Sequence, residues 1–161
     1  MRVGSEMEKP LVKRTSLKAA DCPVARALDA IGDWWSLLII RDALDGMRRF
    51  GEFQKSLGVA KGILSGRLHN LVDVGVLELV PASDGSAYQE YRLTERGRGL
   101  FHVVVGLRQW GETHLFSPEE AHSELVDIAK EEPVEKLELR SGTGRLLGWE
   151  DTIVRKVHRK V

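Results

Sequence analysis

Basic side chains gather in one stretch of this sequence. Between Met47 and Gly75, five cationic residues stand against Glu52 and Asp73, which gives a local net charge of +3. Over the whole chain, 24 Lys and Arg residues balance 24 Asp and Glu residues, so no overall charge attracts the protein to a polyanion. Any phosphate backbone must be contacted locally, and the candidates in this stretch are Arg48, Arg49, Lys55, Lys61 and Arg67.

The segment 58–71, GVAKGILSGRLHNL, combines a good apolar stripe with two poor helix formers. At 100° per residue its leucines share one side, whereas Gly62, Gly66, His69 and Asn70 lie opposite, with Ser65 and Arg67 on the flanks. Each glycine costs about 1 kcal/mol relative to alanine. On an outward face a glycine lets another surface approach the backbone closely, although a tolerated neutral substitution is the alternative explanation.

The sequence lacks the residue patterns that catalysis, metal binding and cofactor binding require. The single cysteine excludes an intrachain disulfide, and the five histidines show no paired metal-ligand spacing. No GxGxxG or P-loop motif is present, and Ser141–Gly144 (SGTG) fits a hairpin turn better than a phosphate cradle. We therefore expect no enzyme, no metal and no cofactor.

The apolar stretches are short. The longest, such as Trp34 to Ile40, fall far below the twenty or so residues needed to span a bilayer, and the N-terminus lacks a signal-peptide hydrophobic region. One cysteine also fits a reducing compartment. The sequence predicts a soluble, cytoplasmic protein without a membrane partner.

Hydrophobic periodicity predicts five helices and a hairpin in the first two thirds of the chain. The hairpin turn is built around Asp84-Gly85, and Thr94 is placed to cap the last of the helices. The expected helices are Pro23–Ile31, Trp34–Leu44, Phe50–Ser56, Ala60–Val74 and one from Thr94 to His114, with strands Val76–Val80 and Tyr88–Leu93.

The segments before and after this region differ from it in composition and hydrophobic periodicity. Residues 1–20 are polar without clear periodicity and predict a flexible arm. After the last apolar helix, Ser117-Pro118-Glu119 predicts a helix to about Lys130, with an acidic first turn. A second hairpin over 137–149 and a short strand over 153–157 are expected beyond it. We divide the chain into an arm (1–20), a main domain (21–116) and a C-terminal extension (117–161).

The order of these elements has a structural meaning. A short helix, a turn at Gly58 and a longer helix make a helix-turn-helix, and a strand pair directly after them makes it a winged helix. The predicted class is α+β, mostly helical. In this geometry the second helix, about 60–74, enters the DNA major groove, so the basic stretch coincides with the DNA-contacting part.

Taken together, the motifs resemble those of the HxlR-type winged-helix transcriptional regulators, relatives of the MarR group. The resemblance runs from about residue 20 to residue 111, in the family's order and spacing. The motifs that carry it are Cys22-Pro23, Ile31-Gly32…Trp35, Asp45-Gly46, Arg49-Phe50 with Glu52, Leu64…Arg67-Leu68…Leu71, and Tyr91-Arg92-Leu93-Thr94…Gly97.

The resemblance implies a homodimer that binds a pseudo-palindromic operator in double-stranded DNA, with N- and C-terminal helices at the interface. We expect it to act as a repressor, and an activator is the alternative. It also adds Arg92 to the phosphate contacts, whereas Ser65 and His69 are expected to read bases; an ordinary surface role is the alternative for His69. The sequence departs from the family in two places. Ala60 replaces a capping serine, and the wing 81–91 holds only acidic charges, which argues against its insertion into the minor groove.

Two further features suggest regulation. Some family members sense oxidants through a cysteine at the position of Cys22, where the helix dipole and Arg26 favour a thiolate and Asp21 opposes it. A helix-start thiol without a signalling role is the alternative. Trp34, Trp35 and Trp110 are expected in the core or dimer interface, or else around a pocket for a small-molecule effector.

A different class of function also fits the neutral net charge and the acidic wing. In this alternative the winged helix is a protein–protein interaction module without sequence-specific DNA binding. The extension is expected to reinforce a dimer, since it is too short to build an independent core.

Overall fold

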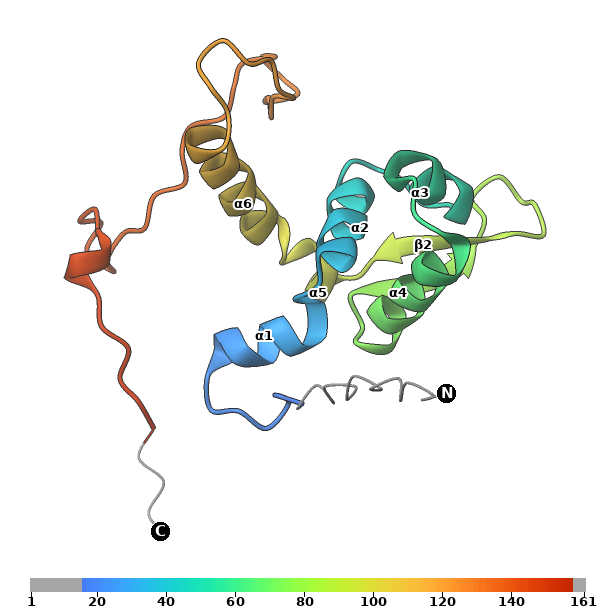
Figure 1. Ribbon diagram of the computed structural model, residues 1–161, viewed down its shortest axis with the longest axis horizontal. Coiled ribbons are helices and arrows are strands. Elements are labelled where there is room, and N and C mark those ends of the chain that lie inside the picture. Colours follow the sequence, from blue (N-terminus) through green and yellow to red (C-terminus); the bar gives the residue numbers. More distant parts are fainter. Residues whose placement is uncertain (1–15, 158–161) are drawn as a thin grey trace, which may run out of the picture.

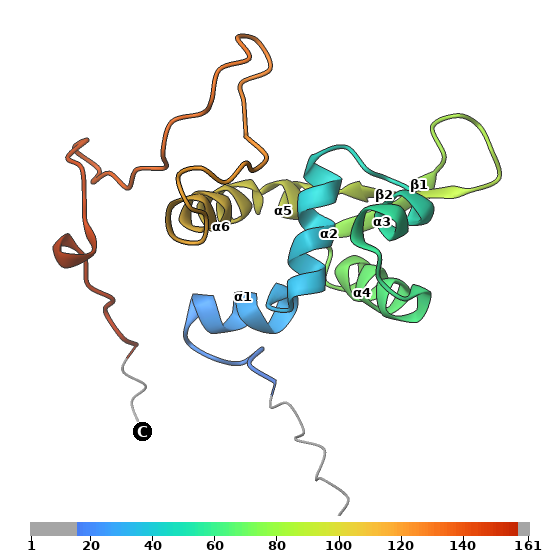
Figure 2. The same cartoon turned by 45° about the horizontal axis from the view of Figure 1, so that its top comes forward.

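The computed structural model describes residues 16–157. The predicted arm therefore lies mostly outside the described residues. Figures 1 and 2 show α3, α4 and the strand hairpin on one side of α2, with α6 on the other. The elements are α1 (Pro23–Ile31), α2 (Trp34–Leu44), α3 (Phe50–Leu57), α4 (Lys61–Asp73), β1 (Leu77–Pro81), β2 (Gln89–Leu93), α5 (Glu95–Arg98), α6 (Phe101–His114) and the 3₁₀ turn η1 (Trp149–Asp151).

The hydrophobic core lies where α2, α3, α4 and β1 meet. The apolar stripe predicted for α4 is fully buried there, and α2 contributes two isoleucines. Its most buried apolar side chains are Ile39, Ile40, Phe53, Leu64, Leu68, Leu71 and Leu77. This packing fixes which face of α4 points outward.

Local capping sets the ends of the helix-turn-helix. Glu52 accepts hydrogen bonds from the backbone N–H groups of Arg48 and Arg49, at 2.7 and 2.8 Å, and so closes the N-terminus of α3. These two bonds hold the Glu52 pKa below its ordinary value. At the other end, Gly58 adopts φ +61°, a left-handed conformation that glycine reaches without steric cost, and α4 follows three residues later.

The wing is a two-stranded antiparallel sheet. Leu77 pairs with Leu93 and Pro81 with Gln89, and the backbone carbonyl of Arg48 accepts a 2.8 Å hydrogen bond from Tyr91, which joins the loop before α3 to β2. Thr94 caps α5 as predicted, because its hydroxyl accepts from Gly97 N–H at 3.1 Å. The winged helix-turn-helix fold class is confirmed.

The single helix expected from Thr94 to His114 is wrong in one respect. The chain forms a short α5 and a separate α6, with Gly99 and Leu100 between them. Most apolar side chains of α6 are not buried within the chain. Only Val105 of α6 is buried, whereas Val103, Leu107 and Trp110 are exposed. The exposed residues Val24 and Leu28 give α1 a similar open apolar face.

The extension does not form the predicted helix, hairpin strands or final strand. Glu120 and Glu124 repel one another at i,i+4 spacing, and so short a helix is unstable in water without packing. Instead, Val134 N–H bonds to the Leu125 carbonyl at 3.1 Å, which closes a loop. The predicted second hairpin is reduced to a tight turn with one bridge, between Arg140 and Leu146. Residues 152–157 form neither helix nor strand.

Candidate nucleic-acid interface

The outward face of α4 is open, as its periodicity predicts. A Cβ added at Gly62 or Gly66 would meet nothing within 4 Å. Ser65 is exposed beside them, and the His69 side chain is 80% exposed, with Nε2 3.4 Å from Asp73 Oδ2. Another molecule can therefore approach the backbone of this helix as closely as van der Waals contact allows.

Asn70 does not belong to this face. The prediction placed it opposite the leucines, but it is half-buried and its Nδ2 donates to the Ala30 carbonyl at 3.3 Å. Around an ideal helix Asn70 lies only about 40° from Gly66. The end of α1 covers this side of α4, and the Asn70 side chain ties the two helices together. It is a structural residue.

Three of the predicted phosphate contacts are exposed cations without an ion pair among residues 16–157: Arg48, Lys55 and Lys61. Lys61 is the first residue of α4, and the preceding Ala60 provides no side-chain cap. The first-turn N–H groups of α4 are consequently left for another acceptor, and the positive end of the helix dipole lies at the residue that carries the Lys61 charge. This is the arrangement that binds phosphate oxygen.

Two other predicted contacts are exposed but already paired. Arg67 Nε lies 3.1 Å from Asp33 Oδ1, in an ion pair whose geometry does not make a hydrogen bond. Asp33 also caps α2, since it accepts from Ser36 N–H at 3.1 Å. Arg92 bonds to Glu78, its cross-strand neighbour, at 2.9 Å. Both guanidinium groups keep part of their surface in solvent and can exchange a carboxylate for a phosphate.

Arg49 has a different environment from the other cations. Its Nη2 lies 2.5 Å from Asp84 Oδ2 and 3.3 Å from Glu90 Oε1, and Glu90 is buried and also accepts from Ser83 Oγ at 3.2 Å. The Arg49 guanidinium holds the Asp84 pKa well below its ordinary range, and the two carboxylates raise the Arg49 pKa. Arg49 therefore fastens the acidic wing to the start of α3, a pairing that the basic loop and the acidic-only wing could have signalled in the sequence.

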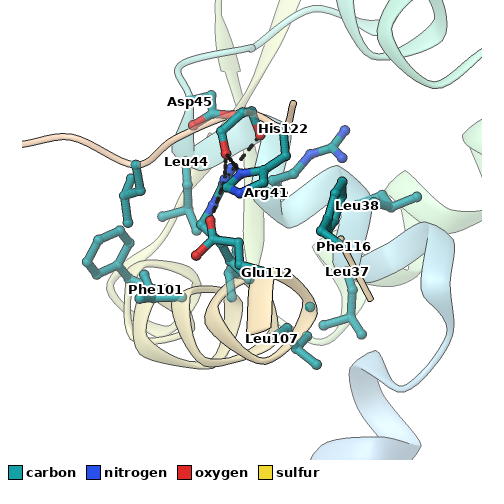
Figure 3. A pocket seen from close by; sticks show the side chains of 16 residues that line it. Leu37, Leu38, Arg41, Leu44, Asp45, Phe101, Leu107, Glu112, Phe116 and His122 are labelled. Atoms are coloured by element: carbon teal, nitrogen blue, oxygen red, sulfur yellow. Dashed lines mark hydrogen bonds and ion pairs between the residues drawn. The ribbon is translucent and has the colours of Figure 1, made fainter. Parts of the chain in front are cut away.

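The regulatory candidates are scattered. Cys22 is exposed at the N-cap of α1 and makes no capping bond. Trp35 packs on the core, whereas Trp34 and Trp110 are 73% and 55% exposed. None of the tryptophans lines the cavity of about 310 Å³ that lies between α2 and α6 (Figure 3). The structure thus separates the tryptophans from the cavity, and sequence reasoning missed the residues that line it.

The fold and the open, cation-flanked helix define the class: a winged helix-turn-helix of the kind that transcriptional regulators use. Residues 30–119 match the HxlR-like helix-turn-helix family. The chain belongs to this family, as its motifs predicted. No helix among the described residues is long and apolar enough to cross a membrane.

Comparisons with known proteins agree. The chain is 49% identical over 96 residues to the HTH-type transcriptional regulator Rv3095 of Mycobacterium tuberculosis, a match that spans 60% of this chain and 61% of that relative. It superimposes on PA1607, a candidate transcription factor, with a TM-score of 0.84 and 57% identity, over 89% of this chain and 100% of that one. The reduced redox regulator HypR matches 58% of this chain and 94% of its own, with a TM-score of 0.53 and 29% identity. The names of these relatives are those of transcriptional and redox regulators.

Proposed function

We propose that the protein is a sequence-specific DNA-binding regulator that acts as a homodimeric repressor. The observation that carries this proposal is the exposed face of α4, where Gly62, Ser65, Gly66 and His69 lie open. Placed in a major groove, the two glycines let the α4 backbone lie close to the base edges, and Ser65 and His69 supply the groups that read them. Lys61 and the α4 N-terminus hold a phosphate, and Arg48 and Lys55 contact the flanking backbone.

The wing has a supporting role in this proposal. Its only charges between Pro81 and Tyr91 are Asp84 and Glu90, and Arg49 pairs with both from the α3 side. The wing therefore stays beside the helix-turn-helix and does not insert into the minor groove. Arg49 acts by positioning the wing, and the predicted phosphate contacts reduce to Arg48, Lys55, Lys61, Arg67 and Arg92.

Homodimerisation accounts for the apolar faces that remain open. Val24 and Leu28 of α1, and Val103, Leu107 and Trp110 of α6, are exposed on the single chain. A two-fold dimer that buries them places two α4 helices about one DNA turn apart, which requires a pseudo-palindromic site. A dimer bound within a promoter blocks access of RNA polymerase to the DNA, and it therefore represses transcription.

Cys22 is the proposed redox sensor. The related HypR is a redox regulator, and Cys22 is exposed at the N-terminus of α1, the proposed interface helix. We expect oxidant to change the DNA affinity of the wild-type protein and to leave Cys22→Ser unaffected. An unaltered response in Cys22→Ser removes this residue from the mechanism.

The test of the main proposal is selection of genomic fragments by the purified protein, followed by anisotropy titration of the best fragment at several salt concentrations. A DNA-binding dimer gives a steep negative slope of log affinity against log salt, because each phosphate contact releases counterions. His69→Ala is expected to alter base preference, whereas Arg67→Ala weakens binding to all sequences alike. Absence of duplex binding would favour the rival, a protein-interaction module, for which the acidic wing is the supporting observation.

A further inference from the structure

The proposed phosphate contacts differ in how they are paired. Arg67 and Arg92 each lie within 3.1 Å of a carboxylate oxygen, whereas the other three cations have no ion pair among residues 16–157. A cation that already has a carboxylate beside it presents little net charge to a polyanion. Two of the proposed contacts are therefore neutralised before DNA arrives.

Arg67 is held on the flank of α4 by Asp33, the cap residue of α2. The Arg67 Nε lies 3.1 Å from Asp33 Oδ1, but this nitrogen is shielded from solvent and makes no hydrogen bond. A shielded donor without an acceptor is unfavourable. The Arg67 side chain as a whole is 43% exposed, so its guanidinium group can turn outward. A phosphate oxygen beside α4 would then supply the hydrogen bond that Asp33 does not accept.

Asp33 keeps other partners when Arg67 leaves it. Its carboxylate accepts hydrogen bonds from the Ser36 N–H, at 3.1 Å, and from Ser36 Oγ, at the positive end of the α2 dipole. Arg67 can therefore move to a phosphate without leaving a buried carboxylate unpaired. Arg49 cannot do the same, because its partner Glu90 is only 4% exposed and would lose its counter-charge.

From this arrangement we infer that Asp33 masks Arg67 and so lowers the affinity of the protein for every duplex. To reach a phosphate, Arg67 must first leave the attraction of Asp33, and this carboxylate then remains near the negatively charged DNA. Asp33 acts through Arg67 and does not itself bind DNA. Because non-specific sites greatly outnumber specific ones in a genome, a weaker general affinity leaves more protein free to find its operator. The inference rests on the proposed function, which supplies DNA as the polyanion.

Glu78 should mask Arg92 to a smaller extent. The Arg92 and Glu78 side chains are 57% and 43% exposed, and water screens an ion pair at such exposure. The Asp33 side chain is 20% exposed, so its attraction to Arg67 is screened less. Asp33 should therefore lower the DNA affinity more than Glu78 does.

The test removes the Asp33 charge and keeps the helix cap. Asparagine is as good an N-cap as aspartate, so Asp33→Asn should retain the start of α2 and the urea midpoint. In anisotropy titrations of the selected duplex, we expect binding tighter by about threefold or more and a salt slope steeper by about 1 per chain, because Arg67 becomes a free cation. Asp33→Ser keeps a capping hydroxyl and should behave alike. Unchanged or weaker binding in both variants would overturn the masking.

Two further carboxylates provide matched comparisons. Glu138 pairs with Arg140 in the extension, so Glu138→Gln makes the same change of charge away from the proposed interface and should leave DNA affinity unchanged. A gain equal to that of Asp33→Asn would show an effect of net charge alone and would overturn the masking. Glu78→Gln should give a smaller gain than Asp33→Asn, and a larger gain would refute the order expected from exposure.

A double-mutant cycle tests whether Asp33 acts through Arg67. In an Arg67→Ala background the masked cation is absent, so adding Asp33→Asn should raise DNA affinity by less than about 1.5-fold. The Arg67→Ala variant keeps the Asp33 cap on α2, which separates this readout from folding. A gain as large as in the wild-type background would mean that Asp33 repels DNA directly, and the masking would be wrong.

Retention on immobilised heparin separates this inference from the proposed function. Heparin is a sulfated polyanion without bases, so the salt concentration at elution reports the exposed cations alone. Asp33→Asn should elute at higher salt than wild type, whereas Asp33→Asn with Arg67→Ala should elute together with Arg67→Ala. If no duplex binds but this shift is present, the proposed function fails and the masking stands. If a duplex binds but neither the elution nor the DNA affinity shifts, the masking fails and the proposed function stands.

Discussion

The core unit, residues 34–93, and the extension, residues 117–157, are built in opposite ways. The core unit closes around Phe53 and the α4 leucines. In the extension no described residue is buried, and Ile128 and Ile153 are 97% and 89% exposed. The core unit holds most of the buried cluster, whereas the extension depends on bonds to α6 and on whatever covers its apolar side chains. DNA recognition requires a surface of fixed shape, which the packed core unit provides. A segment held by few contacts, such as the extension, changes its position more easily.

The largest expected effect is on the free energy of unfolding, to which the two regions should contribute very differently. Phe53→Ala removes a fully buried ring, and we expect a loss of about 3–5 kcal/mol in the free energy of unfolding. Trp149→Ala removes an even larger side chain that is 85% exposed, and should change it by less than about 0.5 kcal/mol. Urea denaturation followed by circular dichroism measures both. A loss in Trp149→Ala comparable to that in Phe53→Ala would show that the extension belongs to the same cooperative unit.

The second prediction compares how the core unit and the extension contribute to DNA binding. Lys61→Ala, at the start of α4, should weaken binding to every sequence and reduce the salt slope by about 1. Lys136→Ala removes another exposed cation, this one from the extension, and should leave both affinity and slope unchanged. Anisotropy titrations over a salt series compare the two. Equal losses would mean that DNA contacts the extension as well as the core unit.

Most of the core unit could be predicted from the sequence because its signals are local. Periodicity placed the leucines of α4 inside and Gly62 and Gly66 outside, and Thr94 marked a helix cap. The extension carried a helix-start motif at Ser117-Pro118-Glu119 as well, yet residues 117–130 form no helix. A local signal stabilises a short helix only when a packed surface supports it.

The site was less predictable than the fold, because pairing between distant residues decides it. Arg49 reads as a phosphate contact until the wing returns and places Asp84 and Glu90 against it, 35 and 41 residues away. Arg108 and Ser123 meet across α6 and the extension in the same way. Residue type tells which charges exist, but only the folded chain tells which remain unpaired.

The glycines of α4 give a third and smaller contrast. Gly62→Ala and Gly66→Ala should each raise stability by up to about 1 kcal/mol, since an exposed helix interior favours alanine. Both should nevertheless weaken operator binding, because a methyl group is added where DNA approaches. Gly106→Ala in α6, whose Cβ would meet only Leu137 Cδ1 at 3.9 Å, should raise stability without affecting DNA. Unchanged binding in the α4 variants would make their glycines neutral.

The smallest expected effect is a dependence on pH that only one region should show. Glu52 in the core unit has a pKa lowered by the backbone N–H groups of Arg48 and Arg49. A depressed pKa in the folded state means that the cap stabilises the fold fully above the ordinary value of 4.5, and that this stabilisation is lost as pH falls through the folded pKa. The difference in urea midpoint between wild type and Glu52→Gln should therefore shrink from about pH 6 to about pH 3.

Asp151 is the matched carboxylate in the extension, and its pKa is also lowered, first by the Gly148 N–H and then by Arg145. The same linkage applies to Asp151 only if its turn unfolds together with the core. Since the extension lacks a buried residue, its turn should open independently, and Asp151→Asn should leave the midpoint of global unfolding unchanged at both pH values. A pH-dependent shift in Asp151→Asn would mean that the extension melts with the core unit, and the contrast between the two regions would then be one of exposure alone.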